Sequence, residues 1–223
     1  IITTYVTNNP FCTITNKNEF MNYKNDTFII NLEQDREDIF KKFKLSLKKK
    51  IIKSKKLKPI ILHKSEIKIN DFLYLYNKTI RRLNISDNII LSKKAIEFIL
   101  FEKENIEINA VSINNKIVSL SVFIISKNYS DYFINLSEDN YNFLTGFLIY
   151  EMINNLKKLN IKFLNLGGGI IAGDSLEQFK RSFNCFPVPF YEFRLINNQE
   201  IYKRLPTLNN NNFFPKFALT KNR

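Results

Sequence analysis

The segment from Leu164 to Ser175 reads LNLGGGIIAGDS and holds four of the chain's five glycines. A chain that uses glycine so rarely clusters it where the backbone turns sharply or approaches another group closely. The segment follows an apolar run and precedes a helix-like run, with Asp174 or Ser175 at the position of an N-cap. A strand, a glycine turn and a helix start together gather backbone N–H groups that suit negative charge. We therefore predict the active site at this turn.

The elements that must position the turn are predicted from apolar periodicity. Helices are predicted at 35–50, 69–83, 92–102, 144–159, 176–183 and 200–205. Strands are predicted at 27–32, 60–63, 106–113, 116–126, 130–137, 161–166 and 190–196. Pro187 and Pro189 are expected to break the helix before the last strand. This order favours an α/β fold, with a central mixed sheet and helices on both faces.

The composition narrows the classes of protein to consider. With 223 residues, of which 44% are hydrophobic, the chain can bury a sizeable core. Its net charge of +13 favours anionic partners such as nucleic acid, phosphorylated sugars or lipid head groups, unless the lysines are merely solvated. Cys12 and Cys185 form no CxxC pair and His63 stands alone, so we expect neither a disulfide framework nor a metal site. Without a signal peptide or a transmembrane run, we expect a cytoplasmic protein.

Three segments resemble the FemABX-like branch of the GNAT acyltransferases. The glycine turn with Asp174-Ser175-Leu176 and the run 179–183 (FKRSF) resembles the C-terminal signature of that branch. The lysine-rich run 43–56 and the run 72–79 resemble two further segments. The resemblance covers roughly residues 27–205 and implies a GNAT-like fold. The branch includes aminoacyl-tRNA-dependent enzymes that build peptidoglycan bridges, and relatives in surface-polysaccharide clusters.

The resemblance also implies a division of the chain. Typical members of the branch carry two GNAT-like halves, and this chain opens at Ile1 without a methionine. We therefore expect residues 1–26 to be a lead-in from an upstream half and residues 27–205 to form the acyltransferase domain. Residues 206–223, which include the low-complexity patch Asn209 to Asn212, are expected to be a poorly ordered tail.

Two residues beside the turn are the candidates for catalysis. Lys180 matches a lysine that, in the family, binds substrate phosphate and steadies charge in acyl transfer. A fixed cation stabilises the oxyanion that forms when an amine attacks an ester or thioester, although a solvated helix lysine is the alternative. Asp174 would hold Lys180 or take the proton of the acceptor amine, or it would only cap the helix. The residues expected to line the substrate pocket are Phe179, Asn165, Gly167, Gly168, Gly169 and Arg181, although the glycines could form a simple tight turn.

A second group of residues could hold the rest of the substrate. Four lysines could grip phosphates of a tRNA or of a nucleotide-linked acceptor, or could form a solvated helix face: Lys48, Lys49, Lys53 and Lys56. The family usually has arginine at the Lys48 position, and lysine lacks its bidentate fork. Arg81 and Arg82 could contact substrate or complement a helix dipole. Tyr76 lies on an apolar stripe, where it belongs to the core or lines an acceptor cleft.

The acyl donor is the open question at this stage. Acetyl-CoA-binding GNAT enzymes cradle pyrophosphate in a Q/R-x-x-G-x-G/A loop, but this chain reads NYNFLTG at 140–146. The side chains of Phe143 and Leu144 would keep backbone amides away from a diphosphate. FemABX-like proteins share this departure because an aminoacyl-tRNA end replaces CoA. We expect no tightly bound cofactor, and a donor that is either aminoacyl-tRNA or acyl-CoA.

The expected function is transfer of an aminoacyl or acetyl group to a primary amine of a phosphate-bearing cell-envelope precursor, either a muropeptide or an amino sugar. One alternative is an acetyl-CoA-dependent N-acetyltransferase of a surface-polysaccharide sugar. The other is a non-catalytic GNAT-like module that binds RNA through the lysine-rich helix. The expected partners are the envelope precursor and tRNA. Peripheral contact with an anionic membrane and the oligomeric state stay open.

Overall fold

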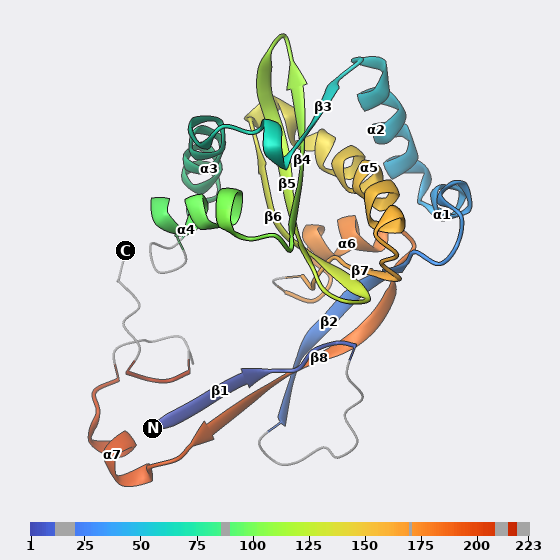
Figure 1. Cartoon of the computed structure of the whole chain (residues 1–223). Helices are drawn as coiled ribbons and strands as arrows, with labels where there is room; N and C mark the ends of the chain where they lie inside the picture. Colours follow the sequence, from blue (N-terminus) through green and yellow to red (C-terminus); the bar gives the residue numbers. More distant parts are fainter. Residues whose placement is uncertain (12–20, 86–89, 170, 208–213, 218–223) are drawn as a thin grey trace.

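The computed structural model describes residues 1–11, 21–85, 90–169, 171–207 and 214–217. Within these residues the strands are β1 (Thr3–Thr7), β2 (Met21–Asn31), β3 (Ile60–His63), β4 (Ile106–Ile113), β5 (Lys116–Ile125), β6 (Tyr129–Ser137), β7 (Phe163–Asn165) and β8 (Phe186–Ile196). They form one mixed sheet in the order β1-β8-β2-β7-β6-β5-β4-β3 (Figure 1). β6 and β7 pair in parallel, and the other neighbouring strands pair antiparallel.

Helices connect these strands. The α-helices of the described residues are α1 (Arg36–Lys42), α2 (Leu45–Lys56), α3 (Ile69–Leu83), α4 (Lys93–Glu97), α5 (Thr145–Lys158), α6 (Ser175–Arg181) and α7 (Gln199–Arg204). Two 3₁₀ helices, η1 (Lys64–Glu66) and η4 (Asp139–Leu144), precede α3 and α5. A π-helix, η3 (Phe98–Glu102), continues α4, so the single helix predicted at 92–102 changes its winding halfway.

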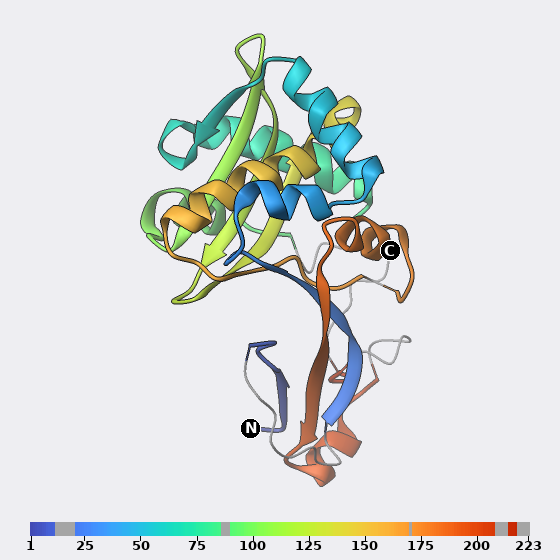
Figure 2. The ribbon, with the colours of Figure 1, turned by 90° about the vertical axis from the view of Figure 1, so that its right-hand side faces the viewer.

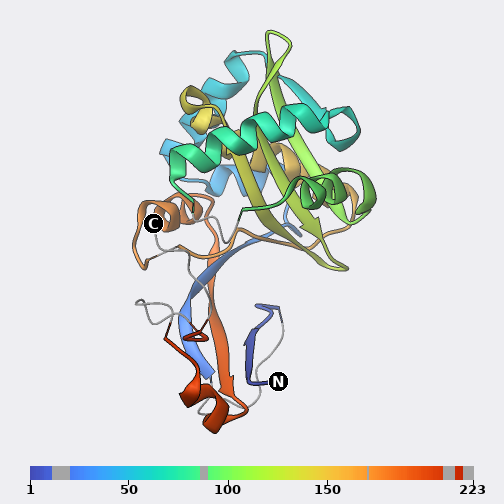
Figure 3. The same ribbon diagram turned by 90° about the vertical axis from the view of Figure 1, so that its left-hand side faces the viewer.

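Each face of the sheet has its own helical layer and its own core. α3 and α4 lie on one face, whereas α1, α2 and α5 lie on the other (Figures 1 and 3). Phe72 of α3 and Ile108 of β4 belong to the first core, and both are 0% exposed. Leu148 and Met152 of α5 belong to the second, and both are 0% exposed. This architecture confirms the predicted α/β mixed sheet with helices on both faces.

Three strands project from this body as a ribbon that ends in α7 (Figures 1 and 2). β8 is the middle strand, because Glu192 to Ile196 pair with β1 and most of the strand pairs with β2 on the other side. The Glu192 side chain is buried in the ribbon, where its carboxylate accepts a hydrogen bond from the Tyr5 hydroxyl at 2.9 Å. Residues 3–7 and 21–26, which precede the boundary expected at residue 27, are therefore strands of the same sheet as the rest.

The described residues at the C-terminal end pack against this ribbon. The Phe214 ring lies 6.3 Å from the ring of Tyr202 in α7 and 6.4 Å from the Tyr5 ring, centroid to centroid. The backbone N–H of Lys216 donates to the Tyr202 hydroxyl at 3.1 Å. Most of the tail expected at 206–223, including the patch Asn209 to Asn212, lies outside the described residues.

The helix predicted at 35–50 is wrong, because the chain forms α1 and α2 with a break at Phe43 and Lys44. Both residues have extended backbone, with ψ of 146°. The Lys44 N–H donates to the Ser182 carbonyl at 2.8 Å, and the Phe43 ring packs edge-on against Phe183 at 5.1 Å. A tertiary contact with the end of α6 therefore replaces one turn of helix, which local periodicity does not reveal.

The last strand also begins earlier than predicted. Pro187 and Pro189 lie inside β8, opposite Phe28 and Asp26 of β2, and do not act as a break before the strand. β1 pairs with β8 only from Glu192 onward, so both prolines occupy a stretch with one open edge. Proline is tolerated in a strand there because its missing N–H costs no ladder hydrogen bond.

The sheet opens where the glycine turn begins. β6 and β7 pair over only three positions, from Tyr129 with Phe163 to Asp131 with Asn165. β6 then continues to Ser137, whereas the chain after Asn165 bonds to β2, because the Leu166 N–H donates to the Phe28 carbonyl at 2.8 Å. The turn therefore starts at the point where the two parallel strands separate.

Gly146 allows the helices of one layer to approach closely. A Cβ atom there would lie 2.6 Å from Leu47 Cδ1 of α2 and 3.9 Å from Phe179 Cε2 of α6. We expect Gly146→Val to lower the free energy of unfolding by about 1–3 kcal/mol in urea titrations, because the branched side chain overpacks this junction. Gly146→Ala is the milder control, since its only close neighbour is the end of a flexible leucine.

The variant Leu47→Ala tests whether this contact is the cause. The decreases in the free energy of unfolding caused by Leu47→Ala and by Gly146→Val should not be additive. The double variant should be more stable, by about 1 kcal/mol or more, than the sum of the two decreases predicts. Strictly additive losses would show that the two side chains do not meet.

Candidate functional site

The amide of Asn165, at the end of β7, joins three strands to the glycine turn. Its Oδ1 accepts hydrogen bonds from the Thr27 hydroxyl of β2 at 2.5 Å and from the Gly167 N–H at 2.9 Å. Its Nδ2 donates to Asp131 Oδ1 of β6 at 2.8 Å. The position was predicted to line the pocket, and the structure places it at the hub of the turn. A fixed amide of this kind holds the start of the turn in one place.

Lys180 of α6 reaches back to this turn and does not point to solvent. Its side chain is only 6% exposed, and its Nζ donates to the Gly168 carbonyl at 2.6 Å. Burial lowers the pKa of the ammonium from 10.5 to about 8, and the Asp174 carboxylate partly opposes this decrease. The nearby Cys185 thiol donates a hydrogen bond to the Lys180 carbonyl. Burial raises the pKa of this thiol to about 12, so it stays neutral. Lys180 is therefore a buried amine that titrates close to neutral pH.

The glycines let three segments meet around this ammonium. Gly167 has a φ of +72°, and a Cβ there would lie 3.3 Å from Lys180 Nζ. A Cβ on Gly168 would lie 2.6 Å from the backbone oxygen of Asp26 and from the amide nitrogen of Asn25. Backbone cannot yield as a flexible side chain can, so only glycine fits this approach of the turn to β2.

The expectation of free N–H donors at the turn is wrong for four of its groups. The Asp174 carboxylate accepts from the N–H of Glu177 at 2.7 Å and from that of Ile171 at 3.1 Å, so Asp174 is the predicted N-cap of α6. Glu177 Oε2 accepts a hydrogen bond from the Gly173 N–H at 2.8 Å, and Asn165 Oδ1 accepts one from the Gly167 N–H. The chain's own side chains thus occupy donors that we had expected to face an anion.

Asp131 is a residue of this cluster that the sequence did not single out. It lies 34 positions before Asn165 and reaches it only because β6 and β7 pair in parallel. Burial raises the pKa of its carboxyl, and the hydrogen bond from Asn165 partly opposes this. A carboxyl with a raised pKa beside a turn is a candidate proton acceptor. A lone aspartate in an alternating strand carries no sequence signal for this role.

A cleft of about 410 Å³ lies on the other side of α6, against α2. Phe179, predicted to line the substrate site, forms part of its wall. The residues that line it are Lys44, Ser46, Leu47, Lys50, Ser175, Gln178, Phe179 and Ser182. Arg181, by contrast, stacks over the Phe28 ring at 4.6 Å and pairs with Glu177 at 2.7 Å. Sequence analysis missed Lys44 and Lys50. The packing of α2 against α6 decides which lysines border the cleft, and the sequence does not reveal that packing.

The four lysines predicted to grip phosphate are spread over the outer surface of α2. Lys49, Lys53 and Lys56 are exposed, with the Lys53 ammonium 5.2 Å from the Phe143 ring centroid. Lys48 is half-buried, and its Nζ donates to the Lys41 carbonyl at 3.0 Å. These side chains therefore form a basic helix face, which is separate from the buried Lys180.

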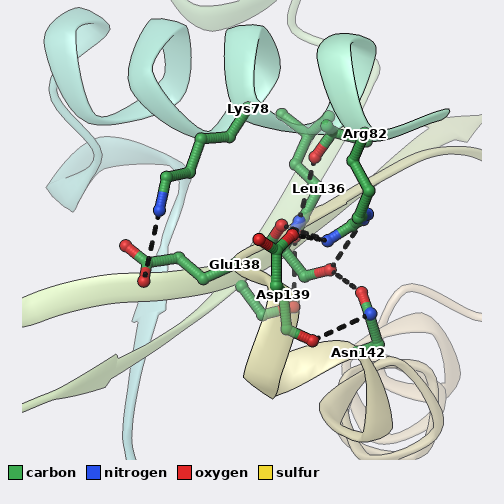
Figure 4. Close-up of polar contacts among 9 residues, drawn as sticks. Lys78, Arg82, Leu136, Glu138, Asp139 and Asn142 are labelled. Atoms are coloured by element: carbon green, nitrogen blue, oxygen red, sulfur yellow. Dashed lines mark hydrogen bonds and ion pairs between the residues drawn. The ribbon is translucent and has the colours of Figure 1, made fainter. Parts of the chain in front are cut away.

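Arg82 holds α3 against the end of β6 (Figure 4). Its Nη1 donates to the Ser137 carbonyl at 2.9 Å and to Asp139 Oδ1 at 3.1 Å. The Ser137 hydroxyl in turn donates to Asn142 Oδ1 at 2.5 Å. Glu138 alongside is held by Lys78 at 3.8 Å, again from α3. These contacts give Arg82 a structural task, whereas its predicted substrate contact stays a proposal.

Tyr76 and Arg81 also lie on α3, across the sheet from α5. Tyr76 is 7% exposed in the core beneath α3, where its hydroxyl accepts the Leu91 N–H at 2.6 Å. It also lines an apolar cleft of about 330 Å³ beside β6. Arg81 is exposed in the last turn of α3. The structure thus gathers Asn165, the glycines, Asp174 and Lys180, and keeps these α3 residues apart from them.

Comparisons with known proteins bear on the fold. No protein-family model and no curated protein sequence matches the chain. Among solved structures, FemX superposes with a TM-score of 0.65 at 12% identity, over 82% of this chain and 64% of FemX. The chain has a FemX-like fold. At this level of identity the likeness concerns the fold, and the chain spans less than two thirds of FemX.

Two further structures share this fold. One is the C-terminal domain of an Agrobacterium fabrum protein described as a lysylphosphatidylglycerol synthetase, with a TM-score of 0.59 and 12% identity over 81% of this chain and 62% of that one. The other is L-PGS of Bacillus licheniformis, with a TM-score of 0.59 and 9% identity over 81% of this chain and 63% of that one.

Two further properties concern the described residues as a whole. They contain no group of three or more histidine, cysteine, aspartate or glutamate side chains placed to hold a metal ion. None of the helices they form is both long enough and apolar enough to span a bilayer.

The hub role of Asn165 can be tested with a side chain of similar size. Asn165→Leu removes three hydrogen bonds and leaves Thr27, Asp131 and the Gly167 N–H without this partner. We expect a loss of about 3 kcal/mol or more in the free energy of unfolding, measured in urea. Asn140→Leu, at an exposed asparagine of η4, should change it by less than about 0.5 kcal/mol. Equal effects of the two substitutions would rule out the hub.

The buried ammonium predicts a pH-dependent stability. Folded Lys180 releases its proton near pH 8, whereas the unfolded chain keeps it to about 10.5, so raising the pH between these values favours the folded state. The parent should therefore gain up to about 3 kcal/mol in its free energy of unfolding over this pH range, compared with Lys180→Met, which has no ammonium. Parallel denaturant titrations at pH 7 and pH 10 measure the difference. A pH-independent difference would mean that the ammonium is not buried in solution.

Proposed function

We propose that the chain is the acyltransferase part of a FemX-like enzyme, which transfers an aminoacyl or acetyl group to a primary amine of a phosphate-bearing cell-envelope precursor. The observation that carries the proposal is the buried Lys180 ammonium at the glycine turn, in a fold shared with FemX. Its neighbour Phe179 borders the cleft on the next face of α6. The pair matches the FK element of the sequence signature.

The reaction would be a direct attack of the acceptor amine on the donor carbonyl carbon. A new C–N bond forms, the carbonyl oxygen becomes an oxyanion, and the ester or thioester bond then breaks. Lys180 would stabilise the oxyanion, since a preorganised cation in a dry site costs no reorganisation during the reaction. The Gly168 carbonyl holds the ammonium in place before substrate arrives.

The amine must also lose a proton, which the leaving oxygen or sulfur finally receives. Both Asp174 oxygens already accept backbone N–H groups as the cap of α6, which limits Asp174 as a base. Asp131 has a raised pKa and lies one amide away from the turn. We therefore favour Asp131 or water for this step, because a raised pKa makes a carboxylate a stronger base.

The surroundings of α5 favour aminoacyl-tRNA over acyl-CoA as the donor. The first turn of α5 is the position of the pyrophosphate loop in CoA-binding GNAT enzymes. Here η4 leads into it, and the Leu47 side chain of α2 packs on buried Gly146, where a Cβ atom would lie 2.6 Å from Leu47 Cδ1. A diphosphate would have to displace the Leu47 side chain to reach these amides.

The exposed lysine face of α2 supports the second candidate, a non-catalytic RNA-binding module. Lys49, Lys53 and Lys56 present three cations along one helix, a pattern that suits a phosphate backbone. This candidate predicts RNA binding without turnover. RNA binding should then survive Lys180→Met.

Turnover by Lys180→Met tests the proposal. The protein is incubated with aminoacyl-tRNAs or acyl-CoAs together with amine acceptors, and the products are read by mass spectrometry. We expect the variant to lose about 10²-fold or more in rate, because it removes the cation at the oxyanion. The parent rate should also fall as the pH rises through about 8, where Lys180 loses its charge.

The control is Lys158→Met, which removes an exposed cation at the end of α5. It should keep most of the parent rate, and circular dichroism should show all three proteins folded. A folded Lys180→Met protein with parental turnover would disprove the role of Lys180. Micromolar CoA binding by calorimetry would favour the acetyl-CoA alternative.

A further inference from the structure

We propose that the cleft between α2 and α6 binds a phosphate ester, with Lys44 and Lys50 holding the phosphate. The four lysines predicted from the sequence do not line this cleft, and Lys180 faces the glycine turn. The inference rests on the proposed function, whose substrate carries a phosphate, and it deepens that function by giving the phosphate a site. Its test reads binding alone and not turnover.

The charges that line the cleft all have one sign. Lys44 and Lys50 are its charged residues, and no aspartate or glutamate is among the residues that line it. Within the described part of the chain, neither ammonium has an ion pair or a hydrogen bond. By contrast, the neighbouring Lys41 pairs with Asp38 at 2.8 Å, and Lys48 donates to the Lys41 carbonyl. Two uncompensated cations at one cleft repel each other, and a bound anion relieves that repulsion.

Hydroxyl groups supply the further donors that a phosphate needs. Ser46 of α2 and Ser175 of α6 both line the cleft, and a phosphate accepts several hydrogen bonds from such groups at once. The Lys44 N–H is tied to the Ser182 carbonyl, which fixes the start of α2 beside α6. The cleft is therefore assembled before any ligand binds.

The apolar part of the cleft indicates an ester and not a free phosphate ion. Leu47 and Phe179 meet at Gly146 and form an apolar surface beside the two lysines. A sugar or base attached to the phosphate could pack on the Phe179 ring. The volume of about 410 Å³ is within the range of small-ligand pockets.

The helical spacing separates this cleft from the buried amine. Ser175, Gln178, Phe179 and Ser182 recur at intervals of three and four, so they share one face of α6. Lys180 is one residue beyond Phe179 and is therefore turned by about 100° around the helix axis. A phosphate held at Lys44 and Lys50 could thus belong to a molecule that passes over Phe179 toward the turn.

The test is equilibrium binding of three probes by calorimetry or fluorescence anisotropy at low salt: inorganic phosphate, uridine diphosphate, and a short single-stranded oligoribonucleotide. We expect the esters to bind more tightly than inorganic phosphate. Lys44→Ala/Lys50→Ala should weaken ester binding by tenfold or more. For the oligoribonucleotide, it should also reduce the slope of log K against log salt by about 1.4, the value for two phosphate contacts on a single strand.

A matched control removes two positive charges elsewhere. Lys127→Ala/Lys158→Ala changes exposed lysines of the β5–β6 turn and the end of α5, and it should keep ester binding within about twofold. Ser46→Glu puts a carboxylate into the cleft at the start of α2, where an acidic residue suits the helix dipole. It should abolish binding without unfolding the protein.

The two probes distinguish the source of the phosphate. Loss of uridine diphosphate binding alone assigns the cleft to a nucleotide-linked substrate, and loss of oligoribonucleotide binding alone assigns it to RNA. The proposal is overturned if neither ester binds the parent, or if the cleft variant and the control variant weaken binding equally. None of these outcomes depends on turnover, so a failure of the transferase proposal stays distinguishable.

Discussion

The hydrogen bond from the Lys180 ammonium to the Gly168 carbonyl is the contact on which the candidate site depends. Removing an ammonium from water costs several kcal/mol unless polar groups replace the hydration. The turn supplies a carbonyl at 2.6 Å, and only glycine at Gly167 and Gly168 lets the backbone come so close to both the lysine and β2. The buried lysine therefore accounts for the glycines that surround it. Asn165 holds the start of this turn in place.

Helix α2 connects this site to the rest of the layer. It begins where the chain leaves α1 to bond with the end of α6, and it packs on the first turn of α5 through Leu47 and Gly146. The same placement sets the Leu47 side chain against Gly146 and leaves a cleft lined by Lys44 and Lys50 beside Phe179. Our proposals for the donor and for the phosphate of the substrate therefore both depend on this one packing arrangement.

Much of the fold could be predicted, because amphipathic segments such as α3 and the meander of β4, β5 and β6 bury one face or alternate in sequence. The break at Phe43 and the early start of β8 could not, since both depend on contacts with distant segments. In the site, the glycine run and the Asp174 cap had local signatures. Asp131 and Lys44 had none, because only strand pairing and helix packing bring them to the site.

The two prolines of β8 have a consequence for how this ribbon meets other chains. Phe28, opposite Pro187, directs its N–H away from β8 to the Gly167 carbonyl, so the proline nitrogens face the outer border of the ribbon. That border lacks donors at Pro187 and Pro189, just where β1 no longer covers it. An incoming strand would find no continuous ladder to complete. We expect the two prolines to hinder edge-to-edge pairing along this stretch of β8.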